Sequence, residues 1–500
     1  MRIVVCLTLG VVAAHWAIGS PKQPPTHLPA LDSTRPYGVG LPHGNMTTAT
    51  SCAAAACHGG GRPGTTGSEL STWARDLSVG IQEPHDPHSR AYQVLFNAVS
   101  VRMVELLEPD TSKRLPAHRT ALCLKCHSAA GATNEQLVAE GVGCAMCHGS
   151  SERWLTIHYL PGWKGMSNRE KADYGFLPTK NLVSRISNCA TCHVGGADRE
   201  VNHDLIAAGH PRLAFEFTRF DHEPIYQKHW KEQLPPPDLE SRSWVIGQVA
   251  SLRATVELLR SRAERVKAGD PHTPWPEFSE GSCYACHQNV ARDPSPETTK
   301  HPLRGVQGER QRRSGAIPWQ TWYSSLASES AELGRLIYAK PTPNLTELSA
   351  LRAEMEKRAP DPDVVIQHCT RVLAALDTTL AEWQISEDEG QTVPFTAEQS
   401  RLFAHTLADR ALGARQQLKD YDWDFVAQRY LGLAAIHHAS SGPNRQTDWH
   451  RPLEQLRQVI DLGRKPGDKI RWDSPRYYQP SDAAGPLSDI RALTLPRSRR

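Results

Sequence analysis

Apolar side chains recur at helical spacing in the middle of the chain. Between residues 245 and 263 they are separated by three or four residues, which predicts one long amphipathic helix. The positions are Val245, Val249, Leu252, Val256, Leu259 and Ala263. This helix leads the chain through Trp275-Pro276-Glu277 towards Cys283.

Helical periodicity dominates from about residue 310 onward. The sequence Asp361-Pro362-Asp363 is typical of a helix start, with an N-cap, a proline at the first helical position and an acid in the first turn. One apolar face then follows, made of Cys369, Val372, Leu373, Leu376, Leu380 and Trp383. We expect Cys369 to be an apolar filler of the core and not a ligand.

Two further apolar runs extend this pattern. Thr396 and Gln399 have the spacing of a capping box ahead of a run that reaches Leu418. Another run covers residues 423–439. These runs predict a helical domain over residues 310–465, packed as a bundle on the preceding region. The Pro- and Arg-rich residues 466–500 are predicted to be an irregular tail.

The first half of the chain lacks long periodic runs. Residues 20–50 are rich in Pro, Gly and Thr and read as a leader. Residues 51–305 alternate short helical pieces with loops. The predicted fold class is therefore mainly α, with short helices and loops followed by a C-terminal helical bundle.

The N-terminus has the pattern of a signal peptide. Met1-Arg2 precedes an apolar run to about Ile18, and small residues there favour cleavage near Ser20. We therefore predict a signal peptide over residues 1–19 and a periplasmic or otherwise extracytoplasmic location. Membrane association requires that this segment stay uncleaved. The formal net charge of +3 over 500 residues does not indicate nucleic-acid binding.

Five cysteine pairs each run directly into a histidine. They are Cys52–Cys57–His58, Cys123–Cys126–His127, Cys144–Cys147–His148, Cys189–Cys192–His193 and Cys283–Cys286–His287. The last four read C-x-x-C-H, the attachment signature of haem c. Two thiols bond the porphyrin edge and the next residue places an imidazole on the iron. Zinc knuckles are the alternative for a C-x-x-C pair, but zinc does not require the adjacent histidine.

The first motif differs from the others in its spacing. Four residues separate Cys52 from Cys57, so the loop between them must bulge for both sulfurs to reach one porphyrin. With this variant included, the chain is expected to carry about five covalently attached haems and their iron. Only Cys6 and Cys369 lie outside the motifs, so no cysteines remain for a disulfide framework.

Histidines outside the motifs decide what each iron can do. A second histidine saturates the iron for electron transfer, whereas an empty position permits binding and chemistry. His203 and His210 are seven residues apart around a short apolar run, which suits ligation of two different haems. His88 opens a helical run, and His158 is too close to His148 to serve the same iron easily. His118, His301, His437 and His438 are weaker candidates, although His437 or His438 could close a site left open.

Three segments carry a family resemblance. They are Trp73 with Asp86-Pro87-His88, Glu140 to Gly149, and Asn202 to Leu213. Together they make roughly residues 50–290 resemble the multihaem cytochrome c-554 family, which is related in haem arrangement to octahaem hydroxylamine oxidoreductase. The resemblance implies a mostly helical fold, haems in close stacked pairs, bis-His ligation of most irons and electron-carrier function. The first motif's spacer, the fifth motif and the C-terminal third depart from the simplest members.

Two functions are compatible with these features. The first is an extracytoplasmic electron-transfer protein that passes electrons among haems to redox partner proteins. The second is a multihaem oxidoreductase that acts on a small nitrogen or sulfur compound at one open iron. No C-x-x-C-K motif and no acid–base cluster identifies a substrate. A third role, docking of a redox partner, is open for residues 310–500.

Overall fold

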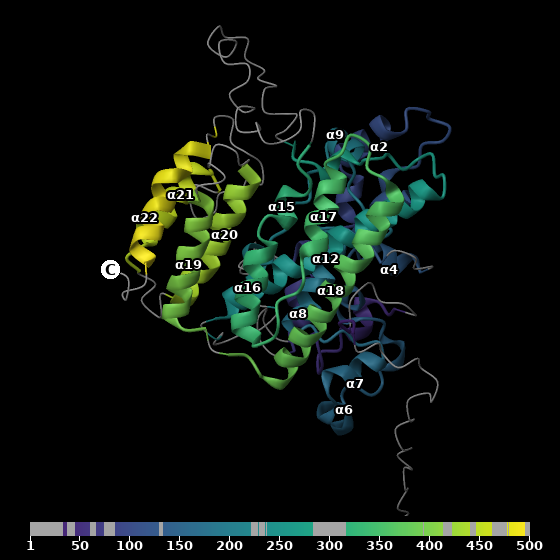
Figure 1. The fold of residues 1–500 in the computed structure, drawn as a ribbon. Helices are drawn as coiled ribbons and strands as arrows, with labels where there is room; N and C mark the ends of the chain where they lie inside the picture. Colours follow the sequence, from purple (N-terminus) through teal and green to yellow (C-terminus); the bar gives the residue numbers. More distant parts are fainter. Residues whose placement is uncertain are drawn as a thin grey trace, which may run out of the picture.

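The structure, a computed structural model, consists of α-helices joined by loops and short 3-10 helices (Figure 1). It describes residues 34–37, 46–60, 67–74, 86–129, 134–221, 229, 236, 238–283, 317–393, 395–413, 423–440, 447–462, 478 and 480–495. No β-strand occurs among these residues, and the predicted mainly-α class is confirmed. The predicted signal peptide lies outside the described residues, as does most of the predicted leader.

The region that carries the cysteine motifs is built from short helices. Its α-helices are α1 (Glu69–Trp73), α2 (Ala98–Leu107), α3 (Ala121–His127), α4 (Glu135–Ala139), α5 (Cys144–His148), α6 (Pro161–Gly165), α7 (Asn168–Asp173), α8 (Leu182–His193), α9 (His203–Ala207) and α10 (Phe217–Asp221). The 3-10 helices include η1 (Ala49–Cys52), η3 (Pro87–Arg90) and η7 (Phe278–Glu280). Most of these helices are shorter than three turns, so packing and not helix propensity must hold them.

The predicted central helix is α12, which runs over Leu239–Lys267. We predicted a single apolar face, but α12 is buried on several sides, because α8, α16, α18 and α20 all pack against it. Small polar residues on the other side of α12, such as Ser243, Ser251 and Thr255, are also buried and allow the neighbouring helices to approach closely. Figure 1 shows α12 in the middle of the molecule, beside α18.

Two of the C-terminal helices, α18 and α19, begin where capping chemistry predicts. They are α15 (Thr321–Ser324), α16 (Ala327–Tyr338), α17 (Thr346–Met355), α18 (Pro362–Glu389), α19 (Ala397–Leu412), α20 (Trp423–Ser440), α21 (His450–Val459) and α22 (Ala484–Thr494). Asp361 caps α18 by accepting hydrogen bonds from the backbone N–H groups of Asp363 and Val364. Thr396 and Gln399 form the predicted capping box of α19. Cys369 is fully buried, as expected.

One boundary differs from the prediction, and another cannot be compared with it because the residues concerned lie outside the described ones. Helix α19 ends at Leu412, and the predicted continuation to Leu418 falls largely outside the described residues. The prediction of an irregular tail over residues 466–500 is wrong for α22, where Leu487, Ile490 and Thr494 form a buried face. Pro486 lies in the first turn of α22, where a proline does not break the helix because that N–H has no intrahelical partner.

One hydrophobic core links the motif region to the C-terminal helices. It extends from Leu182 in α8 through Trp244 in α12 to Ile490 in α22. Helix α12 lies before residue 310 in sequence and packs most extensively on α18, which lies after it. The C-terminal helices therefore pack against α8 and α12, and this packing fixes the positions of the motifs next to those two helices.

Candidate functional site: paired histidines at the cysteine motifs

Three of the motifs form the last turn of a helix. Helices α3, α5 and α8 end at His127, His148 and His193, which are the motif histidines. Residues three apart on an α-helix lie on the same face. Each C-x-x-C pair therefore presents both thiols to one side, with the histidine directly after them. We number the motif sites 1 to 5 in chain order.

The variant motif of site 1 folds without a helix between its cysteines. Residues 53–57 form a turn in which the N–H groups of Cys57 and Gly59 both donate to the carbonyl of Ala54, at 2.8 and 3.1 Å. A Cβ at Gly59 would lie 1.8 Å from the carbonyl oxygen of Ala53, so only glycine fits this crossing. The two extra residues between Cys52 and Cys57 are thus accommodated in a tight loop directly before His58.

Four motif histidines each face one histidine from elsewhere in the chain. The ring centroids of His58 and His158 are 6.2 Å apart, and those of His148 and His229 are 6.3 Å apart. The corresponding distances are 6.4 Å for His127 and His210 and 5.9 Å for His193 and His88. The first two pairs have interplanar angles of 16° and 30°, whereas the last two are near perpendicular at 87° and 90°.

These separations fit an iron ion between the two rings. A metal–imidazole bond is about 2.0 Å long and the bonded nitrogen lies about 1.1 Å from its ring centre, so two axial imidazoles have ring centres about 6 Å apart. Direct stacking would bring the rings closer, as for His118 and Phe96 at 4.2 Å. The donor set, a thiol pair and two imidazoles at each of four places, is that of covalently attached haem with two histidine ligands.

Hydrogen bonds fix which ring nitrogen faces the partner histidine. The Nδ1 atoms of His127, His158 and His210 donate to the backbone carbonyls of Ala91, Leu155 and Pro211 at 2.7–2.8 Å. The Nδ1 atoms of His58 and His88 donate instead to the carboxylates of Glu69 and Asp86, at 3.2 and 2.8 Å. Because Nδ1 carries the proton, Nε2 is left with the lone pair that a metal needs.

Burial keeps two of the motif histidines neutral. It lowers the pKa of His148 to about 4, with further lowering from charge on His229 and His58. It lowers the pKa of His193 to about 3, with contributions from His88 and His127. A neutral imidazole is the ligand form, so these rings need no deprotonation before they bind iron at neutral pH.

Thiol contacts place neighbouring sites next to each other. The Cys52 and Cys144 thiols are hydrogen-bonded, which lowers the pKa of Cys52 and raises that of Cys144. The same contact between Cys126 and Cys192 lowers the pKa of Cys192 and raises that of Cys126. Site 1 therefore adjoins site 3, and site 2 adjoins site 4. Burial raises the pKa of the Cys147 thiol, and the charges of Asp86, beside His88 of site 4, and of Cys192 raise it further, so sites 3 and 4 are neighbours as well.

Site 5 is described only up to its first cysteine. Cys283 follows η7, and Cys286 and His287 lie outside the described residues. His203 is beside this segment, because its backbone N–H donates to Glu277 Oε1 at 2.9 Å and its ring is 6.0 Å from that of Phe278. The side chain of Phe278, next to His203, is 61% accessible.

The structure brings together three of the four predicted non-motif histidines with motif histidines. These are His88, His158 and His210, and the fourth, His203, lies beside Glu277 and Phe278, in the segment that leads to Cys283. Sequence reasoning missed His229, which lies in a stretch of polar and charged residues where neither spacing nor periodicity distinguishes it from His222. His85, His301 and the side chain of His438 lie outside the described residues.

We predicted that His437 or His438 could close a site left open, and the position of His437 does not fit site 5. Ser241 at the start of α12 donates to the carbonyl of Ala435 at 3.3 Å, which places His437 near that end of the helix. Arg262, near the other end, pairs with Glu280 close to Cys283. Twenty-one residues of α-helix span about 30 Å, so His437 is far from site 5.

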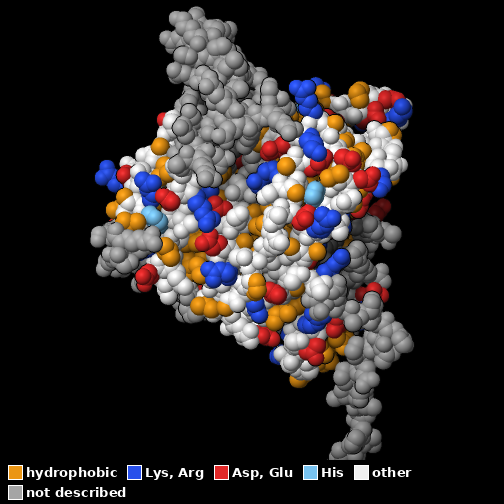
Figure 2. All heavy atoms as spheres, viewed as in Figure 1, with side chains coloured by type: hydrophobic (Ala, Val, Ile, Leu, Met, Phe, Trp, Pro, Cys, Tyr) orange, Lys and Arg blue, Asp and Glu red, His pale blue; other side chains and the backbone are white. Residues whose placement is uncertain are grey.

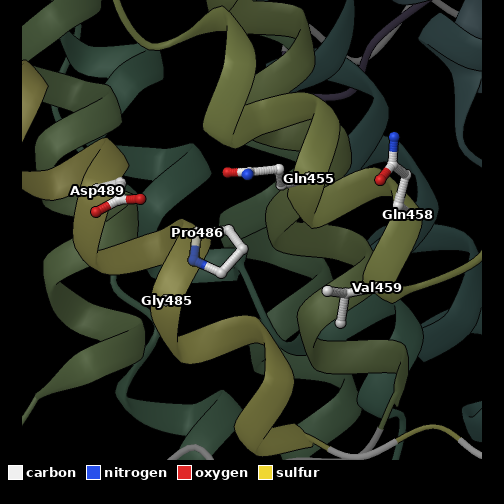
Figure 3. A pocket seen from close by; sticks show the side chains of 6 residues that line it. All are labelled: Gln455, Gln458, Val459, Gly485, Pro486 and Asp489. Carbon is white, nitrogen blue, oxygen red and sulfur yellow. The ribbon is translucent and has the colours of Figure 1, made fainter.

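The described residues contain a further hollow and no further cluster of metal-binding side chains. In that part of the chain, no group of three or more His, Cys, Asp or Glu side chains is arranged to hold a metal ion. A surface hollow of about 480 Å³ lies between α21 and α22, lined by Gln455, Gln458, Val459, Gly485, Pro486 and Asp489 (Figure 3). It contains no motif residue and none of the paired histidines.

The cysteine motifs and their paired histidines define the class of protein, a c-type cytochrome. Residues 84–149 match the family model described as cytochrome c554 and c-prime. This segment contains His88 and the motifs of sites 2 and 3. The match confirms for residues 84–149 the resemblance predicted over roughly residues 50–290. No curated protein and no solved structure matches the chain.

Proposed function

We propose that the protein is an extracytoplasmic multihaem cytochrome that transfers electrons through five covalently bound haems. The observation that carries this proposal is the placement of four motif histidines opposite four other histidines, with ring centroids 5.9–6.4 Å apart. Haem iron with two histidine ligands changes oxidation state without exchanging ligands, which suits electron transfer.

Each site has an assigned pair of axial histidines. They are His58 and His158 at site 1, His127 and His210 at site 2, His148 and His229 at site 3, and His193 and His88 at site 4. We assign His287 and His203 to site 5, because His203 lies beside the segment that enters Cys283. The cysteines that attach the haems are those of the five motifs, including Cys52 and Cys57.

The contacts between sites suggest the order of the electron path. Sites 1 and 3 are joined through Cys52 and Cys144, sites 3 and 4 through Cys147 and Cys192, and sites 4 and 2 through Cys192 and Cys126. His203 is the first residue of the one-turn helix α9 and His210 follows this helix, so site 5 is placed after site 2. The proposed order is 1–3–4–2–5.

The location and partners follow from the class of protein. Haem c is attached outside the cytoplasm, which agrees with the predicted signal peptide. None of the described helices is long and apolar enough to cross a membrane. Figure 2 shows acidic and basic side chains interspersed on the visible face, with no large area of one sign. We propose redox proteins as partners, with no nucleic acid.

The mass of the intact mature protein tests the number of haems. We expect the chain from about Ser20 to carry five haems. A Cys52→Ser/Cys57→Ser double variant is the matched control and should carry four, because only site 1 loses its thiols. A wild-type mass with four haems would remove site 1 from the proposal, and a mass without haem would overturn the function.

A second candidate function is restricted to site 5. Sites 1 to 4 each have a histidine on both sides, so an oxidoreductase acting on a small nitrogen or sulfur compound would need an open iron at site 5. The observation that favours site 5 is the exposed Phe278 beside His203, in the segment that enters this site. A reduced protein that binds no carbon monoxide at any haem would exclude this function.

A further inference from the structure

The hydrogen-bond acceptors behind the paired histidines differ in charge. At site 2 both rings donate from Nδ1 to neutral backbone carbonyls, those of Ala91 and Pro211. At site 4, His88 donates to a carboxylate oxygen of Asp86 at 2.8 Å. At site 1, His58 donates to Glu69 over a longer 3.2 Å, and both of these side chains are more exposed.

Asp86 is rigidly held in its position behind His88. It is the N-cap of η3, and its Oδ1 accepts from both the backbone N–H of His88 at 3.0 Å and the ring N–H at 2.8 Å. The carbonyl of His88 in turn accepts from the N–H of Val142 at 3.1 Å. Asp86 is only 8% exposed, so water does not screen its charge strongly.

A carboxylate acceptor changes the ligand on the other side of the ring. It draws the Nδ1 proton towards itself, which makes Nε2 a stronger electron donor to the metal. A stronger donor and a nearby negative charge both favour the more positive, oxidised iron. We propose that Asp86 is a positioning residue that lowers the reduction potential of site 4 below that of site 2. This inference rests on the proposed ligand pairs.

Asp86 also lies between two neighbouring sites. Its charge interacts with His229 of site 3 and with the Cys147 thiol of the same site. The hydrogen bond acts on His88 alone, so the main effect belongs to site 4 and a smaller electrostatic effect to site 3. An electron that passes along the proposed order would therefore move from a lower potential at site 4 to a higher potential at site 2.

Site 2 provides an internal comparison for site 4. Both ring pairs are near perpendicular, at 87° and 90°, and both consist of two histidines. His193 and His210 are both partly exposed. Exposure of the motif and partner histidines therefore does not separate the two sites. What separates them is the charge of the hydrogen-bond acceptor, which is the Asp86 carboxylate at site 4 and backbone carbonyls at site 2.

The test is an optical redox titration of the fully haem-loaded protein and its variants. Asp86→Asn keeps an oxygen acceptor but removes the charge, and we expect the potential of one component to rise by at least a tenfold change in its redox equilibrium, about 59 mV for one electron. Glu69→Gln should raise a different component by less. Asp110→Asn is the surface control, because Asp110 is exposed and bonds only to nearby residues of its own turn, and it should shift nothing.

Three outcomes would decide the matter. An Asp86→Asn protein that stays low-spin with unchanged potentials would overturn the inference. If this variant fails to load haem at site 4, the reduction potentials of the wild-type protein decide. The component that His88→Ala removes must then have a lower potential than the component that His210→Ala removes. If His88→Ala leaves every iron low-spin, then the ligand pair is wrong and the failure belongs to the proposed function.

Discussion

Replacing His229 by alanine should convert one haem of the five from low-spin to high-spin. His229 is the only described histidine that faces His148, with ring centroids 6.3 Å apart, and its removal leaves one side of that iron open. An open iron binds carbon monoxide when reduced. The expected result is a carbon monoxide difference spectrum whose amplitude corresponds to about one fifth of the total haem, given the five proposed sites.

His118→Ala is the matched control for this variant. His118 is close in space to aromatic rings of Tyr92 and Phe96 and to no motif histidine. Its removal should leave the spin state and the carbon monoxide response unchanged. If His118→Ala opens an iron and His229→Ala does not, then the pairing at site 3 is wrong.

Replacing Arg262 by alanine should lower the free energy of unfolding by about 3–5 kcal/mol, the cost of breaking a buried ion pair. Arg262 is 2% exposed and binds Glu200 Oε2 at 2.6 Å as well as Glu280. Glu280 is buried too and accepts a hydrogen bond from Trp319 Nε1 at 2.9 Å. Without Arg262 its carboxylate would remain buried without a cationic partner.

The pH dependence of this variant gives a second signature. Burial raises the pKa of Glu280 even with Arg262 present, and the loss of Arg262 should raise this pKa further. A carboxyl group with a raised pKa binds more protons in the folded state, so stability falls as the pH rises through the window between its unfolded and folded pKa values. The loss of stability should therefore be smaller at pH 5 than at pH 8.

Urea unfolding followed by circular dichroism measures both effects, and Lys267→Ala is the control. Lys267 pairs with Asp363 on the surface, where solvent screens the interaction, so its loss should have little effect. Equal losses for Arg262→Ala and Lys267→Ala would contradict the structural role assigned to the buried pair. Because Glu280 lies three residues before Cys283, the Arg262 variant should also load haem poorly at site 5.

The local chemistry of this chain could be predicted from the sequence, but the long-range pairing could not. A helix start such as Asp361-Pro362 depends on a few adjacent residues, and the structure shows the predicted cap. The motif cysteines could be recognised from the sequence for the same reason, because each motif consists of a few adjacent residues. The partner of each motif histidine depends on which loops fold over which helices. His229 therefore could not be distinguished from other histidines in its stretch.

The environment of α12 shows the same limit for the fold. Periodicity located the helix, but Arg262, Ser243 and Thr255 on its other side do not appear buried from the sequence. The burial of Arg262 depends on Glu200 and Glu280, and the packing of α12 depends on α18 and α20, which lie more than ninety residues later in the chain. Likewise, the proline of α22 suggested an irregular tail, although a proline in the first turn is compatible with a helix.

The most direct test of the account is the spin state of the haems in the fully loaded wild-type protein, measured by electron paramagnetic resonance when oxidised and by carbon monoxide binding when reduced. The ring pairs at sites 1 to 4 predict that at least four of the five haems are low-spin and do not bind carbon monoxide. The near-parallel pairs at sites 1 and 3 should give rhombic signals, and the near-perpendicular pairs at sites 2 and 4 strongly anisotropic ones. Carbon monoxide binding at two or more haems would contradict the account.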